Sequence, residues 1–387
     1  MNIFLTGATG FVGGELLVNL SQKSGVEKIY CFVRATSQQE ALLKLENIFR
    51  LHDDFFDADK IIPVIGDLFD EQLTETLLAN KIIADTNVII HSAANTSFSR
   101  IYNDVVEKVN IGGLEKIVLW AKQLPDFETF LYIGTATICG NDINHRVIHE
   151  DESPNIHARH LVRYTYTKMQ GELLLHQHLP EEKILIARPS IIMGDSRPVV
   201  PRSPVILWAV ATINLLRLVP VNAQASLDMI PVDYAAEAIV KLLFSKRKYN
   251  VYHISSGKAS ATSAHLLSIS LDNYFKNMPG FHFPDKSLIK QVKQWSKNRL
   301  PQECELFSYS EYLDYWNKTF THPGELRILL AGLEPYLEFM NLGQVFDNAR
   351  LLEDVPSVKQ STPAHVYINN CMKFIEKIDI MEGALNP

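Results

Sequence analysis

The start of the chain joins a short apolar run to three evenly spaced glycines and then to a helical pattern. Residues 2–5 read "NIFL", which is typical of a short buried strand. Gly7, Gly10 and Gly13 follow at the spacing G-x-x-G-x-x-G. Apolar residues then recur with helical periodicity at Phe11, Leu16, Leu17 and Leu20. The first residues therefore predict a strand, a tight glycine turn and a helix.

Each glycine of this turn has a separate steric task. One permits the tight turn, one lets the backbone approach a pyrophosphate, and one lets the helix pack closely against the strand. The helix N-terminus offers free N–H groups and a positive dipole end to the phosphates. A purely structural turn is the alternative, but the position between a strand and a helix is the context that the motif requires. The predicted dinucleotide contacts are Thr6, Gly7, Thr9, Gly10, Phe11, Val12 and Gly13.

Further apolar runs alternate with helical patterns along residues 28–254. Runs such as "VIIH" and "ILIA" are apolar on both faces, as strands of a helix-covered parallel sheet should be. The predicted fold is α/β, a Rossmann-type doubly wound parallel sheet. We assign residues 1–258 to this domain and residues 259–387 to a smaller, mostly helical substrate or cap domain. Residues 195–228 are expected to contribute to the substrate site.

The ends of the predicted strands carry the next candidate cofactor contacts. The second strand ends in Arg34 with no acid beside it, and a guanidinium there favours the 2′-phosphate of NADPH over NADH. The alternative is a solvated surface arginine. Asp67 and Leu68 are placed to reach the adenine. The cofactor is expected to lie across the small residues that end the fourth strand, which are Ser92, Ala93 and Ala94.

The stretch "YTYTK" contains two tyrosines and one lysine at the start of a predicted helix. Residues four apart share a helix face, so Lys168 is paired with Tyr164 rather than with Tyr166. A lysine ammonium lowers the pKa of a nearby tyrosine, which would allow that tyrosine to exchange a proton near neutrality. Thr135 ends a neighbouring strand and is placed as a further hydrogen-bond donor. These residue types predict carbonyl reduction at Thr135, Tyr164 and Lys168.

Together these motifs resemble an extended short-chain dehydrogenase/reductase, and more narrowly the fatty acyl-CoA reductase and thioester reductase branch. The resemblance covers about two-thirds of the chain and rests on several stretches in the family's order: "TGATGFVGG", "VIGDL", "VIIHSAANTSF", "VNIGG", "YTYTKMQGE", "ARPSIIMGD", "LDMIPVDYAAEAIV" and "VYHISSG". The later stretches "HPGELRILLAGLEPYLEF" and "QVFDNARLLEDV" are similar to the helical C-terminal domain of alcohol-forming members.

The resemblance implies a role for each matched residue. Tyr164 is implied as the general acid, Lys168 as the residue that also holds the nicotinamide ribose, and Thr135 as a donor to the substrate oxygen. Asn110 is implied as a helper that shapes the strand ends, with a simple turn or capping asparagine as the alternative. Pro189 and Ser190 are expected beside the nicotinamide. Family members often have Ser where Gly134 stands, so a second hydroxyl is missing there.

Three other features allow a functional and a structural interpretation. The apolar run 205–219 fits either an acyl-chain lining or an ordinary core helix. The basic stretch with Lys290, Lys293, Lys297 and Arg299 fits either the phosphates of CoA or a solvated helix face. The histidine pairs "HRVIH" and "HARH" lack a completing carboxylate or cysteine cluster, so no metal site is predicted.

Composition and charge argue against several classes of protein. The net charge of −7 argues against nucleic-acid binding. The four cysteines are scattered without a CxxC pair, and no signal peptide or membrane-length apolar run is evident, which favours a cytoplasmic protein without a transmembrane segment. No heptad repeat defines an oligomeric state.

The predicted function is NADPH-dependent reduction of an acyl thioester, on CoA or an acyl carrier protein, to the aldehyde and then to the primary alcohol. An NAD(P)-dependent nucleotide-sugar epimerase/dehydratase or a ketone reductase is the alternative within the fold; either would need a polar pocket. A non-catalytic NADP(H)-binding sensor or scaffold is the alternative from another class, and it would not depend on Tyr164.

Overall fold

The computed structural model describes residues 1–199, 203, 205–297 and 304–385. Its centre is a seven-stranded, wholly parallel sheet with the order β11-β7-β5-β4-β1-β2-β3. The strands are β1 (Asn2–Thr6), β2 (Lys28–Val33), β3 (Ile61–Ile65), β4 (Val88–His91), β5 (Thr129–Ile133), β7 (Ile184–Pro189) and β11 (Val251–Ile254). The strand order reverses between β1 and β4, which is where such sheets bind ligands at their carboxyl ends. The predicted doubly wound fold is confirmed.

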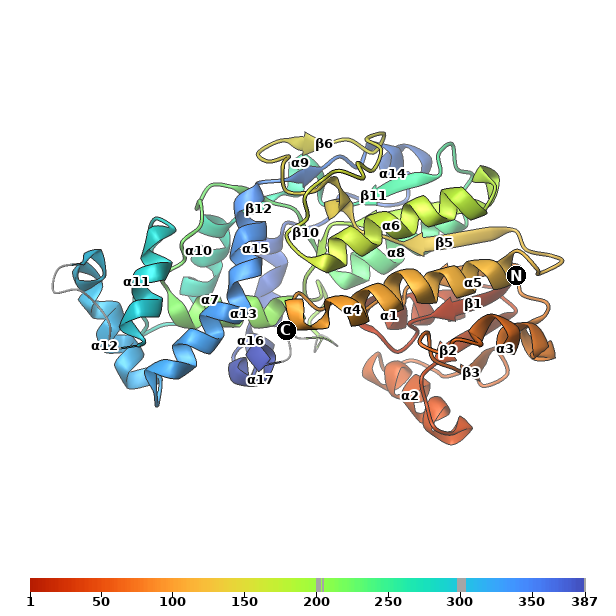
Figure 1. The fold of residues 1–387 in the computed structure, drawn as a ribbon, viewed down its shortest axis with the longest axis horizontal. Coiled ribbons are helices and arrows are strands. Elements are labelled where there is room, and N and C mark those ends of the chain that lie inside the picture. The colour runs from red at the N-terminus through yellow and green to blue at the C-terminus, as the bar shows by residue number, and fades with distance from the viewer. Residues whose placement is uncertain (200–202, 204, 298–303, 386–387) are drawn as a thin grey trace.

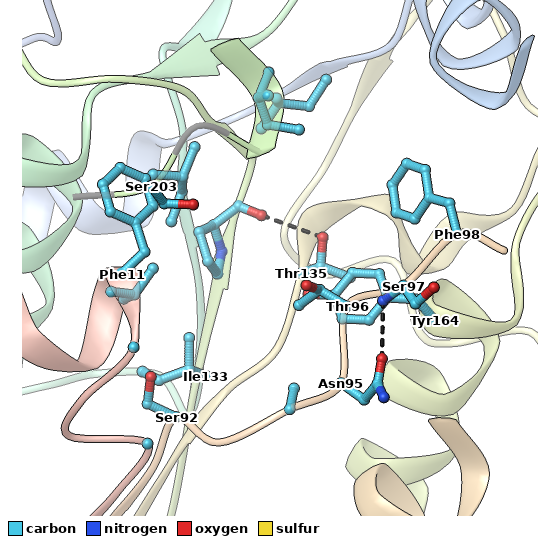
Figure 2. A pocket seen from close by; sticks show the side chains of 18 of the residues that line it. Phe11, Ser92, Asn95, Thr96, Ser97, Phe98, Ile133, Thr135, Tyr164 and Ser203 are labelled. Atoms are coloured by element: carbon cyan, nitrogen blue, oxygen red, sulfur yellow. Dashed lines mark hydrogen bonds between the residues drawn. The ribbon is translucent and has the colours of Figure 1, made fainter. Parts of the chain in front are cut away.

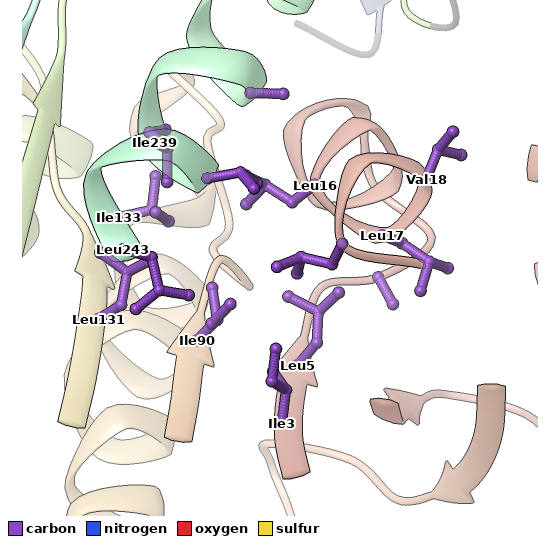
Figure 3. Close-up of a cluster of buried hydrophobic side chains, with 14 of the residues drawn as sticks. Ile3, Leu5, Leu16, Leu17, Val18, Ile90, Leu131, Ile133, Ile239 and Leu243 are labelled. Carbon is purple, nitrogen blue, oxygen red and sulfur yellow. The ribbon is translucent and has the colours of Figure 1, made fainter. Parts of the chain in front are cut away.

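Alternate residues of each strand face two different helix layers. Ile3 and Leu5 belong to one core, packed with helices α1 (Phe11–Ser21), α2 (Gln38–Leu51) and α8 (Val232–Leu243). Figure 3 shows leucines of α1 and α8 meeting side chains of β1, β4 and β5 in this core. Phe4 belongs to the opposite core, which is completed by α3 (Leu73–Ala79), α5 (Leu114–Ala121) and α6 (Arg163–His178). The sheet is therefore covered on both faces, which explains the continuous apolar runs of its strands.

A third hydrophobic core lies among the C-terminal helices, at the end of the molecule remote from the sheet (Figure 1). Its centre includes Trp208 and Trp316, both almost fully buried. The helices of this part are α7 (Val205–Leu216), α10 (Ala264–Tyr274), α11 (Ser287–Trp295), α12 (Ser310–Thr319), α13 (Pro323–Leu342), α15 (Ala364–Tyr367), α16 (Met372–Ile375) and α17 (Ile380–Leu385).

The chain returns to the first domain after α13. Strand β13 (Val345–Phe346) pairs in parallel with β6 (Val147–Ile148), and α14 (Ala349–Asp354) places Leu351 in the core that contains Ile3. The division at residue 258 is therefore not a single break, because residues 345–358 pack with the sheet domain. Within the described residues, no helix has the length and apolar character needed to cross a bilayer.

Candidate active site

One large cavity of about 1240 Å³ lies at the carboxyl ends of the sheet strands. Residues that directly follow five strands line it, namely Gly7, Arg34, Gly66, Ser92 and Gly134. The cavity continues between the C-terminal helices, where α7, α10 and α13 contribute apolar side chains. The structure thus brings the predicted cofactor turn, the predicted catalytic residues and the apolar segment 205–219 to one space.

The glycine turn has no room for side chains at two of its three glycines. Gly7 has φ +73°, and a Cβ there would lie 2.6 Å from the amide nitrogen of Ala93. A Cβ on Gly13 would lie 2.0 Å from the carbonyl oxygen of Gly7. Gly10 directly precedes α1, and no side chain caps the helix there. This uncapped first turn lines the cavity through Phe11, so backbone N–H groups are available to a phosphate. The turn fits the pyrophosphate of a dinucleotide.

Two cations line the cavity near the end of β2. Arg34 is exposed, and Lys44 of α2 donates a hydrogen bond from Nζ to its carbonyl oxygen at 2.9 Å. Lys44 also pairs with Glu40 at 2.6 Å. Among the described lining residues, Asp67 is the one carboxylate. Sequence reasoning missed Lys44. Its position on the helix that follows Arg34 could have indicated that it lies near the end of β2.

Two of the predicted cofactor-site residues, Thr6 and Asn110, are not among the residues that line the cavity. Thr6 is fully buried, and its hydroxyl lies 3.1 Å from Nδ1 of His91 and accepts a hydrogen bond from Ala93 N–H at 3.2 Å. Asn110 lies in a π-helical turn (Lys108–Gly113) and hydrogen bonds the backbone of Asn95. Both residues shape the loop after β4, as predicted for Asn110.

The other predicted cofactor contacts all line the cavity: Gly7, Thr9, Gly10, Phe11, Val12, Gly13, Arg34, Asp67, Leu68, Ser92, Ala93, Ala94, Lys168, Pro189 and Ser190.

Tyr164 and Lys168 both line the cavity from the first turns of α6. Nζ of Lys168 lies 6.0 Å from the ring centroid of Tyr164 and 4.8 Å from that of Tyr132, and it donates to the carbonyl oxygen of Ile133 at 2.7 Å. Tyr166 faces away from the cavity and packs edge-on against the ring of His160 at 5.9 Å. The pairing of Lys168 with Tyr164 rather than Tyr166 therefore agrees with the structure.

Burial dominates the ionisation of this pair. It raises the pKa of Tyr164 well above the usual value, so the prediction that Lys168 brings this pKa toward neutrality is wrong for the structure. Burial lowers the pKa of Lys168 to about 7, against the opposing effect of Glu172. At neutral pH the Tyr164 hydroxyl is thus protonated, and Lys168 is poised between ammonium and amine.

The hydroxyl of Thr135 has a neighbour that sequence reasoning missed. Its Oγ1 lies 3.0 Å from that of Thr137 and also donates to the carbonyl oxygen of Pro189 at 3.4 Å. Figure 2 shows Thr135 beside Tyr164, with Phe98 next to them and Phe11 on the other side of the cavity. Thr137 thus provides the second hydroxyl that Gly134 lacks. Its signal was the repeated threonine in "TAT".

Gly134 has a packing reason of its own. A Cβ there would lie 3.0 Å from Oε1 of Glu172, a fully buried carboxylate held by the Arg188 guanidinium at 2.7 Å. This ion pair lies directly behind the active site, because Gly134 lines the cavity.

An aromatic cluster connects the catalytic residues with the apolar part of the cavity. The ring of Phe98 lies 6.4 Å from Tyr164, 5.0 Å from Tyr336 and 5.4 Å from Phe339. Beyond it, the lining is formed by Ile206, Ala209, Val210, Ile213, Val219, Met229, Ala264, Leu267, Ser268, Leu271, Phe281, Phe283 and Met340. None of these described residues is charged.

The basic stretch on α11 does not line this cavity. Lys293 is paired with Glu334 of α13 at 2.8 Å, which favours the interpretation as a solvated helix face. Arg299 lies outside the described residues. Among the described histidines, cysteines and acids, no group of three is arranged to hold a metal ion.

The sequence matches the family model described as "Male sterility protein", an NAD-binding domain, over residues 5–239. A linear gramicidin synthase polypeptide of Brevibacillus parabrevis is 30% identical over 66% of this chain and 5% of its own length. Fatty acyl-CoA reductase 1 of Rattus norvegicus is 26% identical over 72% of this chain. The aligned region spans 62% of that reductase.

Solved structures with this fold include the terminal R domain of the myxalamid PKS-NRPS pathway, with TM-score 0.71 and 21% identity over 97% of this chain and 90% of that one. UDP-glucuronic acid 4-epimerase of Bacillus cereus, solved with NAD, has TM-score 0.64 and 17% identity over 97% of this chain and 99% of that one. At these identities the likeness shows the fold alone. The family model covers more than half of the chain and includes the glycine turn, Thr135, Tyr164 and Lys168, so the protein belongs to the male sterility family of extended short-chain dehydrogenases/reductases, in its fatty acyl-CoA reductase and thioester reductase branch.

Proposed function

We propose that the protein reduces acyl thioesters with NADPH, first to the aldehyde and then to the primary alcohol. The observation that carries this proposal is the continuous cavity that joins the glycine turn, the Thr135–Tyr164–Lys168 group and a long apolar chamber. An acyl chain needs such an apolar lining next to a few hydrogen-bond donors. The thiol carrier is CoA, as the name of the rat relative suggests, or an acyl carrier protein.

The residues present fit NADPH. Gly7, Gly10 and the start of α1 would hold its pyrophosphate, and Lys168 would hold the nicotinamide ribose. Arg34, supported by Lys44, would hold the 2′-phosphate, because guanidinium and ammonium groups both pair well with phosphate. When bound, the reduced nicotinamide supplies the hydride that the carbonyl carbon needs.

The side chains of the site supply the proton and the oxygen contacts. Thr135 and Tyr164 would donate hydrogen bonds to the carbonyl oxygen, where negative charge develops. Tyr164 keeps its proton at neutral pH because burial raises its pKa, so it can give that proton to the oxygen. The Lys168 ammonium would stabilise the resulting phenolate.

The hemithioacetal formed in this way would break its C–S bond. Its hydroxyl proton returns to Tyr164, the thiol leaves with a proton from solvent, and the aldehyde remains. A second reduction at the same residues leaves the proton of Tyr164 on the alcohol oxygen. The full reaction then consumes two NADPH and two protons for each thiol released.

The nucleotide-sugar alternative shares the fold but gains no specific support from the cavity. A sugar nucleotide needs polar partners, whereas the described residues beyond Phe98 are apolar except for Ser268. The hydroxyl of Ser268 already donates to the carbonyl oxygen of His265 at 2.8 Å.

The direct test is incubation of the purified protein with NADPH and a series of acyl-CoAs, with Tyr164→Phe as control. Absorbance loss reports NADPH oxidation, a thiol reagent reports release, and mass spectrometry identifies the products. We expect two NADPH to be oxidised for each thiol released, with the alcohol as product. One NADPH oxidised per thiol would mean that the aldehyde is released. Absence of turnover with both acyl-CoA and acyl carrier protein would refute the proposal.

A further inference from the structure

A short segment between α10 and α11 contributes to the lining of the apolar chamber. Figure 1 shows α10 and α11 on the side of the molecule remote from the sheet. Phe281 and Phe283 of this segment line the cavity, and their rings lie parallel within 18° at a centroid distance of 6.5 Å. Both rings are partly buried and pack against the core of the C-terminal helices, which includes Leu288 and Trp316. We name residues 279–283 the floor segment.

The floor segment is attached to the end of α7 through the backbone. The N–H of His282 donates to the carbonyl oxygen of Arg217 at 3.0 Å, and the N–H of Val219 donates to the carbonyl oxygen of His282 at 2.9 Å. On its other side, the Tyr312 hydroxyl of α12 donates to the carbonyl oxygen of Gly280 at 2.7 Å. The two phenylalanines are therefore carried by a backbone that is held from both sides.

Arg217 also holds the floor segment through its side chain. Its guanidinium is fully buried, lies 4.4 Å from the ring centroid of Phe281, and donates to the carbonyl oxygen of Pro279 at 3.3 Å. The same group is oriented by Asn214, whose Oδ1 accepts from Nη2 at 2.9 Å, and by an ion pair with Asp272 of α10. A planar guanidinium can stack on a ring and hydrogen bond at its edges together, which an ammonium cannot do.

The backbone of Arg217 is strained to reach this position. Its φ is +63°, in the left-handed region that usually takes glycine at the end of a helix. Such a conformation in a bulky residue persists only where its surroundings require it. Here the contacts of the guanidinium with Phe281, Pro279 and Asp272 stabilise this conformation.

We propose that Phe281, held in place by Arg217, sets the longest straight acyl chain that the protein accepts. This inference rests on the proposed function, since it treats the apolar chamber as the acyl site. Phe281 is the specificity-determining residue that would touch the end of the chain. Arg217 is a positioning residue that acts through Phe281. A chain longer than the distance from Tyr164 to Phe281 would have to displace a ring that is stacked on the buried guanidinium of Arg217.

The test measures binding of a homologous series of straight-chain primary alcohols to Tyr164→Phe protein, so it needs neither turnover nor a thiol carrier. Affinity is expected to rise by about fourfold with each methylene that enters the chamber and then to level off or fall at a limiting length. Phe281→Ala should move that limit to longer alcohols. Phe55→Ala, on a residue that is 80% exposed and outside the cavity, should leave it unchanged.

Arg217→Lys separates positioning from general stability. If Arg217 acts through Phe281, Arg217→Lys should relax the limit in the same direction as Phe281→Ala while short alcohols bind as before. If Arg217→Lys does not fold, Asp272→Asn is measured in its place, because it removes the ion-pair partner of the guanidinium. An equal loss of affinity at every chain length would mean that Arg217 is only structural.

An unchanged limit in Phe281→Ala would overturn the proposal, and so would failure of every alcohol to bind. Either result is distinct from failure of the proposed function, which is read separately as the absence of NADPH oxidation by the wild-type protein with any acyl thioester.

Discussion

The side-chain amide of Asn110 satisfies both backbone polar groups of Asn95. Its Oδ1 accepts a hydrogen bond from the Asn95 N–H at 2.7 Å, and its Nδ2 donates to the Asn95 carbonyl oxygen at 3.0 Å. Nδ2 also donates to the hydroxyl of Thr167 on α6 at 2.9 Å. The amide is 2% exposed and lies in a π-helical turn, a local widening that often occurs at functional sites. One side chain thus joins the loop after β4 to the helix that carries Tyr164.

Asn110→Ala should destabilise the protein and loosen the cavity wall. It leaves the N–H and the carbonyl oxygen of Asn95 without their side-chain partner and removes one hydrogen bond of the Thr167 hydroxyl, which still donates to the carbonyl oxygen of Tyr164 at 2.8 Å. The loss of these three bonds costs about 2 kcal/mol or more of unfolding free energy. Denaturant unfolding and the KM for the acyl substrate are the measurements, and both should worsen. Asn110→Asp keeps an acceptor for the Asn95 N–H but loses both donated bonds, so it should fall between wild type and Asn110→Ala. A stability of Asn110→Ala equal to wild type would contradict this account.

Tyr164→Phe should reduce kcat by about a hundredfold or more, because it removes the proton donor and keeps the ring. The affinity for NADPH, measured by fluorescence titration, should remain within about twofold. Tyr166→Phe is the matched control, since Tyr166 packs against His160 outside the cavity, and it should retain activity. Equal activity of the two variants would exclude Tyr164 as the general acid.

Arg34→Ala should weaken NADPH binding by about tenfold to a hundredfold and leave NADH binding nearly unchanged. A charge-assisted hydrogen bond contributes about 1.5–3 kcal/mol, and only NADPH carries the 2′-phosphate that would receive it. Isothermal titration with both cofactors makes the comparison. Arg327→Ala, on an exposed arginine of α13 outside the cavity, is the control. A parallel loss for both cofactors would show that Arg34 does not select NADPH.

Thr137→Val should lower kcat by about fivefold. The Thr137 hydroxyl lies 3.0 Å from that of Thr135, and one neutral hydrogen bond contributes about 1 kcal/mol. Steady-state kinetics should show the loss in kcat rather than in the KM for NADPH. Thr137→Ser keeps the hydroxyl and should keep the rate. A merely structural role of the threonine methyl group would instead slow Thr137→Ser and spare Thr137→Val, which keeps that methyl.

The rate of reduction should fall as the pH rises through about 7. Burial lowers the pKa of Lys168 to about 7, so the ammonium is present below this pH and is lost above it. The ammonium stabilises the phenolate that Tyr164 becomes on giving up its proton, so its loss slows the step. In Lys168→Arg the cation persists at all accessible pH values, and the slower residual rate should lack this inflection. An inflection that persists in Lys168→Arg would assign it to another group.

The sequence by itself determined the sheet, the glycine turn and the active face of α6. Strand runs that are apolar on both faces predict a covered parallel sheet, and a spacing of four residues selects Tyr164 over Tyr166 as the partner of Lys168. These features follow from backbone geometry within one element, so a local pattern is enough to reveal them.

Tertiary structure alone decided how residues far apart in the sequence act together. Asn110 and Thr6 shape the loop after β4 from other elements, and Arg217, which interrupts an apolar run in the sequence, is stacked on Phe281. The pKa of Tyr164 rises rather than falls because burial, which depends on every neighbouring element, outweighs the lysine one turn away. Long-range contacts and desolvation are set by packing, and packing leaves no periodic mark on the sequence.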